Sequence, residues 1–222
     1  HLNLWEHAFV SQQSPLYEPL KNHAGNYLVW NGLVPDFADT KAADIFANYH
    51  EETFVKKGIS GFKLDECDNS NIAFGRNAWS FPDLSSFPSG IDGEQMHQLF
   101  GILYQKTIFN IYKKLNQRTY LDVRASNAFA SSYPAALYSD TYDRNEYIQM
   151  IINAGFSGML WSPEVRESNS MADFMHRSQV AVLSAQTVYN SWYLQNPPWL
   201  QIDKDKNNRG EFMDNVAEVE AG

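Results

Sequence analysis

The chain has 222 residues, of which 44% are hydrophobic and 19% are charged, so it is long and apolar enough for one domain with a substantial core. Its net charge of −9 argues against a nucleic-acid partner, because such a partner requires a basic face. The chain holds no run of 18 apolar residues that would span a membrane, and its single cysteine, Cys67, excludes an internal disulfide and a cysteine-based metal site.

Short apolar runs with the composition of β-strands recur along the chain. Between them, apolar residues follow the i, i+3, i+4, i+7 spacing of a helix face over residues 42–49, 96–115 and 147–154. Asp143 with Glu146 resembles a capping box, and Ser170 with Asp173 offers a similar start for the last helix. The predicted strands cover residues 2–10, 59–64, 119–123, 135–138, 156–161 and about 181–189.

The alternation of strands and helices predicts an α/β fold with a parallel sheet and helices outside it. Acids at the carboxyl ends of strands favour a (β/α)8 TIM barrel, which has eight strands. Six are predicted here, and because the chain starts within an apolar pattern, we expect the other two strands before His1. The partial barrel is assigned to residues 1–194, and residues 195–222 form a polar segment leading out of it. No glycine-rich phosphate loop supports a nucleotide-binding fold.

Carboxylates follow two of the predicted strands. The run from Gly58 to Leu64 stops in a cluster of acids that begins at Asp65, and Asp140 ends a later strand. The carboxyl end of the strands is where α/β barrels hold their chemistry. Two carboxylates, one as nucleophile and one as proton donor, are what glycoside hydrolysis requires. The long loop at residues 69–90, directly after the first cluster, is typical of a segment that covers a site.

The same segments resemble glycoside hydrolase family 31, the family of α-glucosidases and α-xylosidases. Phe62-Lys63-Leu64-Asp65 is similar to the nucleophile motif, and Tyr138-Ser139-Asp140 is similar to the motif that carries the acid/base. Four further segments resemble family motifs in the same order: Leu4 to Val10, Pro35-Asp36-Phe37, Val123 to Ser126 with Tyr133-Pro134, and Gly155 to Glu164. The resemblance covers nearly the whole chain.

The resemblance implies a retaining α-glycoside hydrolase that acts on an α-linked glucoside, xyloside or galactoside. Asp65 is then the nucleophile and Asp140 the acid/base, and no cofactor or metal is implied. The substrate-binding residues would be Arg124, Trp161, Glu164, Lys63 and Trp5. The partners would be the carbohydrate and the remainder of the same enzyme, both before His1 and after the chain. A transglycosylase using the same intermediate is an alternative.

Several of these residues have competing interpretations. Lys63 would stabilise the ionised form of Asp65, and the apolar neighbours of Asp140 would favour its protonated form by desolvation. Asp143 is a rival for the acid/base, although its place at a helix start suits capping. Arg124 would bind sugar hydroxyls or form a buried ion pair, and Trp5 and Trp161 would form a sugar platform or pack in the core.

Three departures from the family pattern bear on the sugar specificity and leave open a second alternative, a catalytically silent sugar-binding barrel. Ser139 stands where the family has Gly, and Glu164 stands where it has Asp. The Arg-x-His expected near the last strand is not found around Tyr189.

Overall fold

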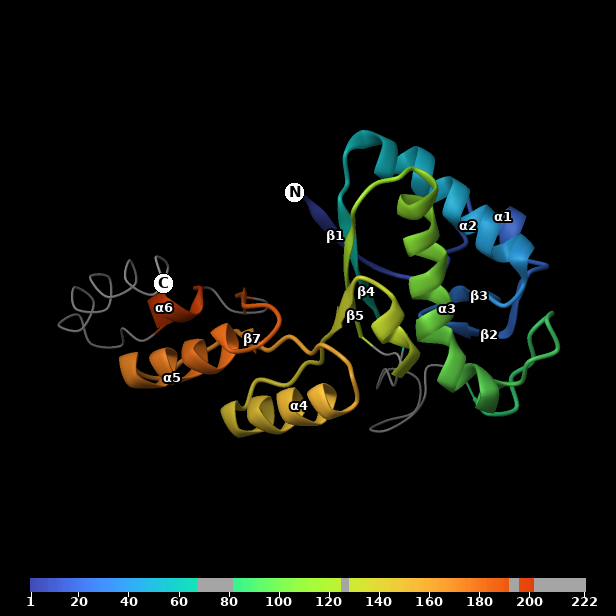
Figure 1. Ribbon diagram of the computed structural model, residues 1–222. Coiled ribbons are helices and arrows are strands. Elements are labelled where there is room, and N and C mark those ends of the chain that lie inside the picture. Colours follow the sequence, from blue (N-terminus) through green and yellow to red (C-terminus); the bar gives the residue numbers. More distant parts are fainter. Residues whose placement is uncertain (68–81, 125–127, 192–195, 202–222) are drawn as a thin grey trace. The chain divides into compact units, whose positions relative to one another are not determined.

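A computed structural model of the protein describes residues 1–67, 82–124, 128–191 and 196–201 (Figure 1). The chain divides into two compact units, His1–Ala135 and Ala136–Gly222. The elements of the first unit, in chain order, are β1 (Asn3–His7), α1 (Tyr17–Leu20), β2 (Ala24–Val29), β3 (Gly32–Pro35), α2 (Thr40–Thr53), the 3-10 helix η1 (Val55–Lys57), β4 (Gly61–Asp65), α3 (Gly93–Lys114), β5 (Tyr120–Val123) and the 3-10 helix η2 (Ala128–Ser132).

Strand β6 (Ala135–Leu137) begins where the two units divide. The elements that follow it are α4 (Arg144–Phe156), β7 (Glu164–Val165), α5 (Met171–Val182), β8 (Val188–Tyr189) and α6 (Pro198–Gln201). The predicted loop at 69–90 is described only from residue 82 onward, and the predicted tail only over residues 196–201. In the described part of the chain, none of the helices combines the length and the hydropathy that crossing a membrane requires.

The first unit is built on parallel strands in the order β1, β4, β5. Strand β1 pairs with β4 from Asn3 opposite Gly61 to His7 opposite Asp65. Strand β4 pairs with β5 in the same direction, and helices α2 and α3 form the two connections between the strands (Figure 1). Parallel strands joined by helices are the repeating unit of a (β/α)8 barrel. The predicted α/β fold and the strands at 2–10, 59–64 and 119–123 are therefore confirmed.

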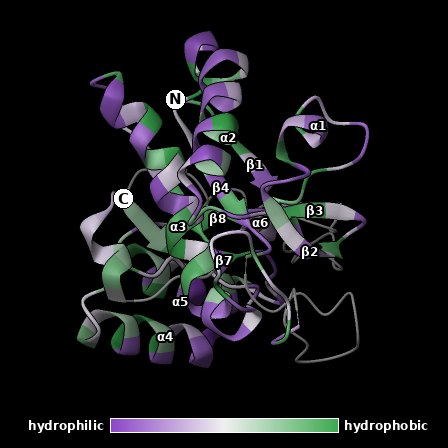
Figure 2. Cartoon of the chain, turned by 90° about the vertical axis from the view of Figure 1, so that its right-hand side faces the viewer, coloured by the Kyte–Doolittle hydropathy of each residue, from purple (hydrophilic) through white to green (hydrophobic). Residues whose placement is uncertain are grey.

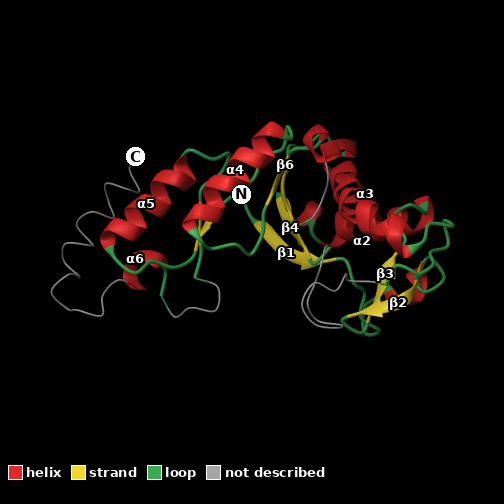
Figure 3. Cartoon of the chain, turned by 90° about the horizontal axis from the view of Figure 1, so that it is seen from below, coloured by secondary structure: helices red, strands yellow, loops and turns green. Residues whose placement is uncertain are grey.

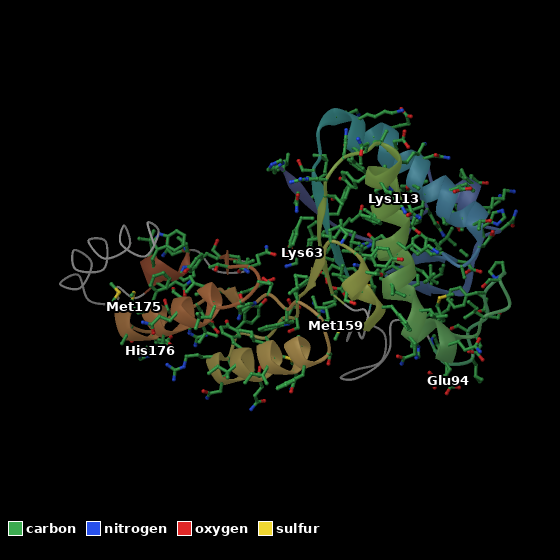
Figure 4. The ribbon with its side chains drawn as sticks, in the orientation of Figure 1. Lys63, Glu94, Lys113, Met159, Met175 and His176 are labelled. Atoms are coloured by element: carbon green, nitrogen blue, oxygen red, sulfur yellow. The ribbon has the colours of Figure 1, made fainter. Side chains whose placement is uncertain are left out.

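The two faces of this sheet differ because successive residues of a strand point to opposite sides. Phe62 and Leu64 of β4, with Leu121 and Val123 of β5, are at most 1% exposed. The Phe62 ring lies 5.8 Å from the ring of His50 on α2, so this face packs against the helices. The alternating positions face the other side of the sheet. Lys63 is one of them (Figure 4), and Asp65, two residues later on the strand, is another.

Helix α3 illustrates why these segments are helical. Its side chains at one face are fully buried, among them Met96, Phe100, Tyr104 and Ile108 at spacings of four residues. Asp92 caps its first turn by accepting a hydrogen bond from the Gln95 N–H, and its last turn carries two lysines, as the helix dipole favours. The helix predicted from the periodicity over residues 96–115 is therefore confirmed.

A β-hairpin that was not predicted follows β1. Strands β2 and β3 are antiparallel and form a separate two-stranded sheet (Figure 3). Trp30 and Asn31, between the two strands, both have positive φ, 52° and 57°, as the central residues of a type I′ turn do. The dipeptide Asn31-Gly32 is the sequence signal that could have identified it.

Two predicted strands of the second unit were wrong over most of their length. Residues 156–161 begin with the end of α4 and continue through Gly158, whose φ of 71° ends the helix in the left-handed region, and only Trp161 forms a bridge, to Leu137. The run at 181–189 begins inside α5 and reaches β8 only at Val188. Apolar residues alone do not distinguish a helix face from a short buried strand.

The second unit holds two amphipathic helices and a short parallel sheet. Helix α4 alternates between hydrophilic and hydrophobic residues along its turns (Figure 2), and Tyr147 and Ala154 on its buried side pack with Trp161. Helix α5 packs Phe174 and Ala181 against the β7–β8 sheet. Ser170 caps α5 by accepting a hydrogen bond from the Asp173 N–H, which confirms the predicted helix start.

Candidate active site

Asp65 is the last residue of β4, at the carboxyl end of the parallel strands. Its side chain is only 9% exposed, although the strand ends there. A buried carboxylate is costly unless hydrogen-bond donors or cations surround it. Three segments of the first unit provide hydrogen-bond donors and a cation around Asp65.

Both carboxylate oxygens of Asp65 accept hydrogen bonds. The indole Nε1–H of Trp5 on β1 donates to Oδ2 over 2.6 Å, and the Glu66 backbone N–H donates to Oδ1 over 2.7 Å. The guanidinium of Arg124, which directly follows β5, lies 3.4 Å from Oδ1. Three neighbouring segments therefore hold one carboxylate in a fixed orientation, with a cation at its side.

The backbone turns sharply directly after Asp65. Glu66 has a φ of 58°, a left-handed conformation that a non-glycine residue adopts at a cost of about 1–3 kcal/mol. This conformation lets the Glu66 N–H bond back to the preceding carboxylate, as the Oδ1 contact shows. Strain of this kind is often found at functional sites.

Lys63 occupies the same face of β4 as Asp65, two residues earlier. In the strand register it lies between Trp5 of β1 and Asp122 of β5. Lys63, Asp65 and Arg124 therefore gather on one face, together with Trp5. Of the predicted residues, the structure brings these four together. Ala125 and Ser126, which complete the motif that begins at Val123, lie outside the described residues.

Two residues that the sequence analysis missed extend this face. The His7 ring lies 5.5 Å from the Trp5 ring, edge to face, and 5.5 Å from the Trp30 ring. Burial lowers the pKa of His7, and the nearby charges of Glu6 and Asp65 only partly oppose that effect. An aromatic row from the turn of the β2–β3 hairpin thus leads to Asp65. The signal that could have found Trp30 is its place beside the Asn31-Gly32 turn.

In the second unit, Asp140 follows β6 and is exposed. It accepts a hydrogen bond from the Tyr142 hydroxyl over 3.3 Å. The Arg166 guanidinium lies 3.6 Å from the centre of the Tyr142 ring, and burial raises the pKa of Tyr142, with further contributions from the charges of Asp140 and Glu164.

Asp143, the rival for the acid/base role, caps helix α4. Its Oδ1 accepts hydrogen bonds from the backbone N–H groups of Asn145 and Glu146, at 2.8 and 3.1 Å. A carboxylate engaged in this way has its geometry fixed by the helix. The capping interpretation of Asp143 is confirmed.

The other two predicted residues of the second unit are buried. Glu164 on β7 is 4% exposed, and its Oε2 accepts a hydrogen bond from the Asn190 side-chain amide. Trp161 is 6% exposed and packs against Tyr147 with ring centres 6.0 Å apart. For Trp161 this favours core packing, the second of its two interpretations, over a sugar platform.

Within the described residues, no group of three or more His, Cys, Asp or Glu side chains is arranged to hold a metal ion. The carboxylates of Asp65 and Asp140 are of a type that can act as a nucleophile or transfer a proton. A sequence model of the glycosyl hydrolase family 31 TIM-barrel domain matches residues 4–199. The chain belongs to glycosyl hydrolase family 31.

Solved structures with a similar fold include one enzyme that is named as a member of family 31. A family 31 sulfoquinovosidase from E. rectale is 17% identical, with a TM-score of 0.67, and the match covers 97% of this chain and 35% of that one. A cycloalternan-degrading enzyme from Trueperella pyogenes is 12% identical, with a TM-score of 0.68 and coverage of 97% and 33%. The uncharacterised protein lmo2446 from Listeria monocytogenes EGD-e is 16% identical, with a TM-score of 0.67 and coverage of 97% and 22%.

No curated protein matches the sequence. The family 31 chain described here spans between 22% and 35% of the length of these three solved structures. Among the residues that the structure describes, the parallel strands form an open sheet, which agrees with the predicted partial (β/α)8 barrel.

Proposed function

We propose that this chain supplies the nucleophile and the acid/base of a retaining α-glycoside hydrolase, with Asp65 and Asp140 in these roles. The observation that carries the proposal is the carboxylate of Asp65, which is buried at the end of β4 and held by Trp5, Glu66 and Arg124. Membership of a family of glycoside hydrolases supports the same reaction class.

The proposed reaction proceeds in two steps. An oxygen of Asp65 forms a bond to the anomeric carbon while the bond to the leaving oxygen breaks, and Asp140 gives that oxygen its proton. A water molecule then attacks the anomeric carbon, Asp140 takes a proton from it, and the bond to Asp65 breaks. Two inversions at the anomeric carbon leave the configuration of the sugar unchanged. The exposure of Asp140 allows water and product to reach it.

Lys63 and Arg124 are proposed to bind sugar hydroxyls or to balance the charge of Asp65 from the same face of the sheet. Trp5, with 54% of its surface exposed, presents an open ring to a substrate on that face. Glu164, which is 4% exposed in the second unit, is proposed as a further sugar-binding residue. The named activities of the two characterised neighbours differ, so they do not select a sugar. An α-linked glucoside, xyloside or galactoside is the proposed substrate class.

The remainder of the same enzyme is the proposed partner of this chain, because barrel strands are needed to close the sheet around a substrate. A transglycosylase, which replaces the attacking water with a sugar hydroxyl, uses the same two carboxylates. Product analysis in the presence of an acceptor sugar distinguishes these two outcomes.

Trapping with a fluorinated α-glycosyl fluoride tests the proposal in the complete enzyme. The electron-withdrawing fluorine slows the second step, so the glycosyl-enzyme accumulates, and mass spectrometry of the digest should locate the label on Asp65. Asp65→Ala should remove the label, whereas Asp143→Ala, which changes only a helix cap, should retain it. Sugar binding without any label would instead support the silent sugar-binding barrel.

A further inference from the structure

The Trp5 indole is aimed at Asp65 along a diagonal of the sheet. In the register of β1 and β4, Trp5 is opposite Lys63, and Asp65 is opposite His7. Diagonal neighbours on one face of paired strands are within reach of an aromatic side chain. The indole Nε1–H uses that reach to donate to Oδ2 of Asp65 over 2.6 Å. The polar edge of Trp5 is therefore engaged with the carboxylate.

The strand that carries Trp5 is anchored on its other face by the next residue. Glu6 points toward the helices, where Oε1 accepts a hydrogen bond from the Tyr104 hydroxyl over 2.6 Å and Oε2 lies 2.7 Å from His50 Nε2. His50 Nδ1 lies 2.8 Å from the Phe46 carbonyl oxygen, which can only accept. Helices α2 and α3 thus both hold β1 at Glu6, and this fixes the backbone from which Trp5 extends.

The two oxygens of Asp65 are held unequally by the described residues. Oδ1 accepts the Glu66 N–H and faces Arg124, whereas Oδ2 accepts the Trp5 N–H. Hydrogen bonds from Glu66 and Arg124 to one oxygen leave the carboxylate free to rotate about its own axis. The Trp5 bond to the second oxygen removes that freedom.

We propose that Trp5 is a positioning residue for Asp65: its indole N–H fixes the plane of the carboxylate so that one oxygen faces the anomeric carbon. This rests on the proposed function, because it requires Asp65 to be the nucleophile. When Asp65 forms its bond to the sugar, the carboxylate charge is lost to an ester. When that bond breaks, the negative charge returns to the carboxylate, and the Trp5 N–H is in position to donate a hydrogen bond to it. A sugar platform would need only the ring of Trp5, whereas this role needs the N–H.

Two replacements separate the ring from the N–H. Trp5→Phe keeps an aromatic ring, and β-(benzothiophen-3-yl)alanine at position 5, introduced by nonsense suppression, keeps the shape of the indole but lacks the donor. In the complete enzyme, kcat and the rate of labelling of Asp65 by the fluorinated sugar should fall about 10- to 100-fold for the isostere, the scale of one hydrogen bond to a charged group. KM should change little, because the ring surface is preserved.

A readout that does not depend on activity is the indole ¹⁵N–¹H resonance of Trp5. A short hydrogen bond to a carboxylate shifts the proton downfield, so Asp65→Asn should move this resonance upfield. Asp143→Asn, which alters a carboxylate at the start of α4, should leave it in place. This measurement is made on folded protein and needs no substrate.

Each outcome bears on one of the two proposals. Labelling of the isostere at the rate of the unmodified enzyme, or a raised KM with unchanged kcat, would overturn the positioning role and leave the nucleophile assignment intact. An indole resonance that does not shift in the Asp65→Asn variant would also overturn the positioning role. Absence of any label on Asp65 in the unmodified enzyme would overturn the proposed function, and the positioning role with it.

Discussion

The carboxylate of Glu6 and the imidazole of His50 meet over 2.7 Å on the helix side of the sheet, with side chains that are only 15% and 4% exposed. The Tyr104 hydroxyl completes this buried cluster by donating to the other oxygen of Glu6. Buried charges of this kind stabilise a fold only when every partner is present. The cluster connects β1 to both of the helices behind it.

The first prediction compares two tyrosines of α3 that are both fully buried. The Tyr104 hydroxyl donates to the Glu6 carboxylate over 2.6 Å, whereas the Tyr112 hydroxyl donates to the Ile59 carbonyl over 3.0 Å. Tyr104→Phe should lower the free energy of unfolding by about 1.5–3 kcal/mol and Tyr112→Phe by about 0.5–1.5 kcal/mol, because bonds to charged groups are stronger. Denaturant titration of both variants measures this, and equal losses would contradict it.

The second prediction concerns the pH dependence of stability. Burial lowers the pKa of His7 below its ordinary value of 6.5, so the unfolded chain binds a proton there at a higher pH than the folded chain does. The folded state should therefore lose stability as the pH falls below about 6.5. His7→Gln should make the decrease in melting temperature between neutral pH and mild acid smaller. An unchanged pH dependence in the variant would show that other groups account for it.

The third prediction uses two glycines with opposite surroundings. A Cβ on Gly61 would lie 2.1 Å from the Tyr120 carbonyl oxygen in the neighbouring strand, whereas a Cβ on Gly155 in α4 would meet nothing within 4 Å. Gly61→Ala should destabilise the protein by about 1–3 kcal/mol by forcing β4 and β5 apart. Gly155→Ala should stabilise it by about 0.5–1 kcal/mol, because alanine favours a helix. Thermal unfolding of both variants tests the sign of each change.

The fourth prediction separates the two carboxylates by their roles. Asp65→Ala should abolish turnover of every substrate, while Asp140→Ala should still react with an activated aryl glycoside whose leaving group needs no proton. On unactivated glycosides the loss should be about 10²- to 10⁴-fold. Azide should restore turnover of Asp140→Ala and give the α-glycosyl azide, which product analysis detects. Full activity of this variant on an unactivated glycoside would assign the acid/base role to another residue.

The fifth prediction is geometric. In a crystal structure of the complete enzyme, the carboxyl groups of Asp65 and Asp140 should face one cavity at a separation of about 5–7 Å, close to the value typical of retaining enzymes. A separation well beyond about 10 Å would rule out this pair, since a single sugar could not contact both groups.

Much of the scaffold could be predicted from local patterns. The apolar periodicity of α2, α3 and α4 and the apolar runs of β1, β4 and β5 are local patterns. Each can be recognised from neighbouring residues in the sequence. The caps at Asp143 and Ser170 are equally local. The ordered series of motifs from Leu4 to Glu164 gave the family, and the match over residues 4–199 confirms it.

What the sequence determined by itself is the alternation of β1, β4 and β5 with the helices between them, and the place of Asp65 at the end of β4, because both depend on neighbours along the chain. Only the tertiary structure decided which partners those acids have. Trp5 and Asp65 are far apart in the sequence. Their hydrogen bond depends on the register of β1 and β4 and on the contacts of Glu6 with helices α2 and α3, which hold β1 in place. The burial of Trp161 likewise depends on α4 packing over it. Contacts between residues that are distant in the sequence depend on tertiary packing, so the local periodicity of the sequence does not predict them.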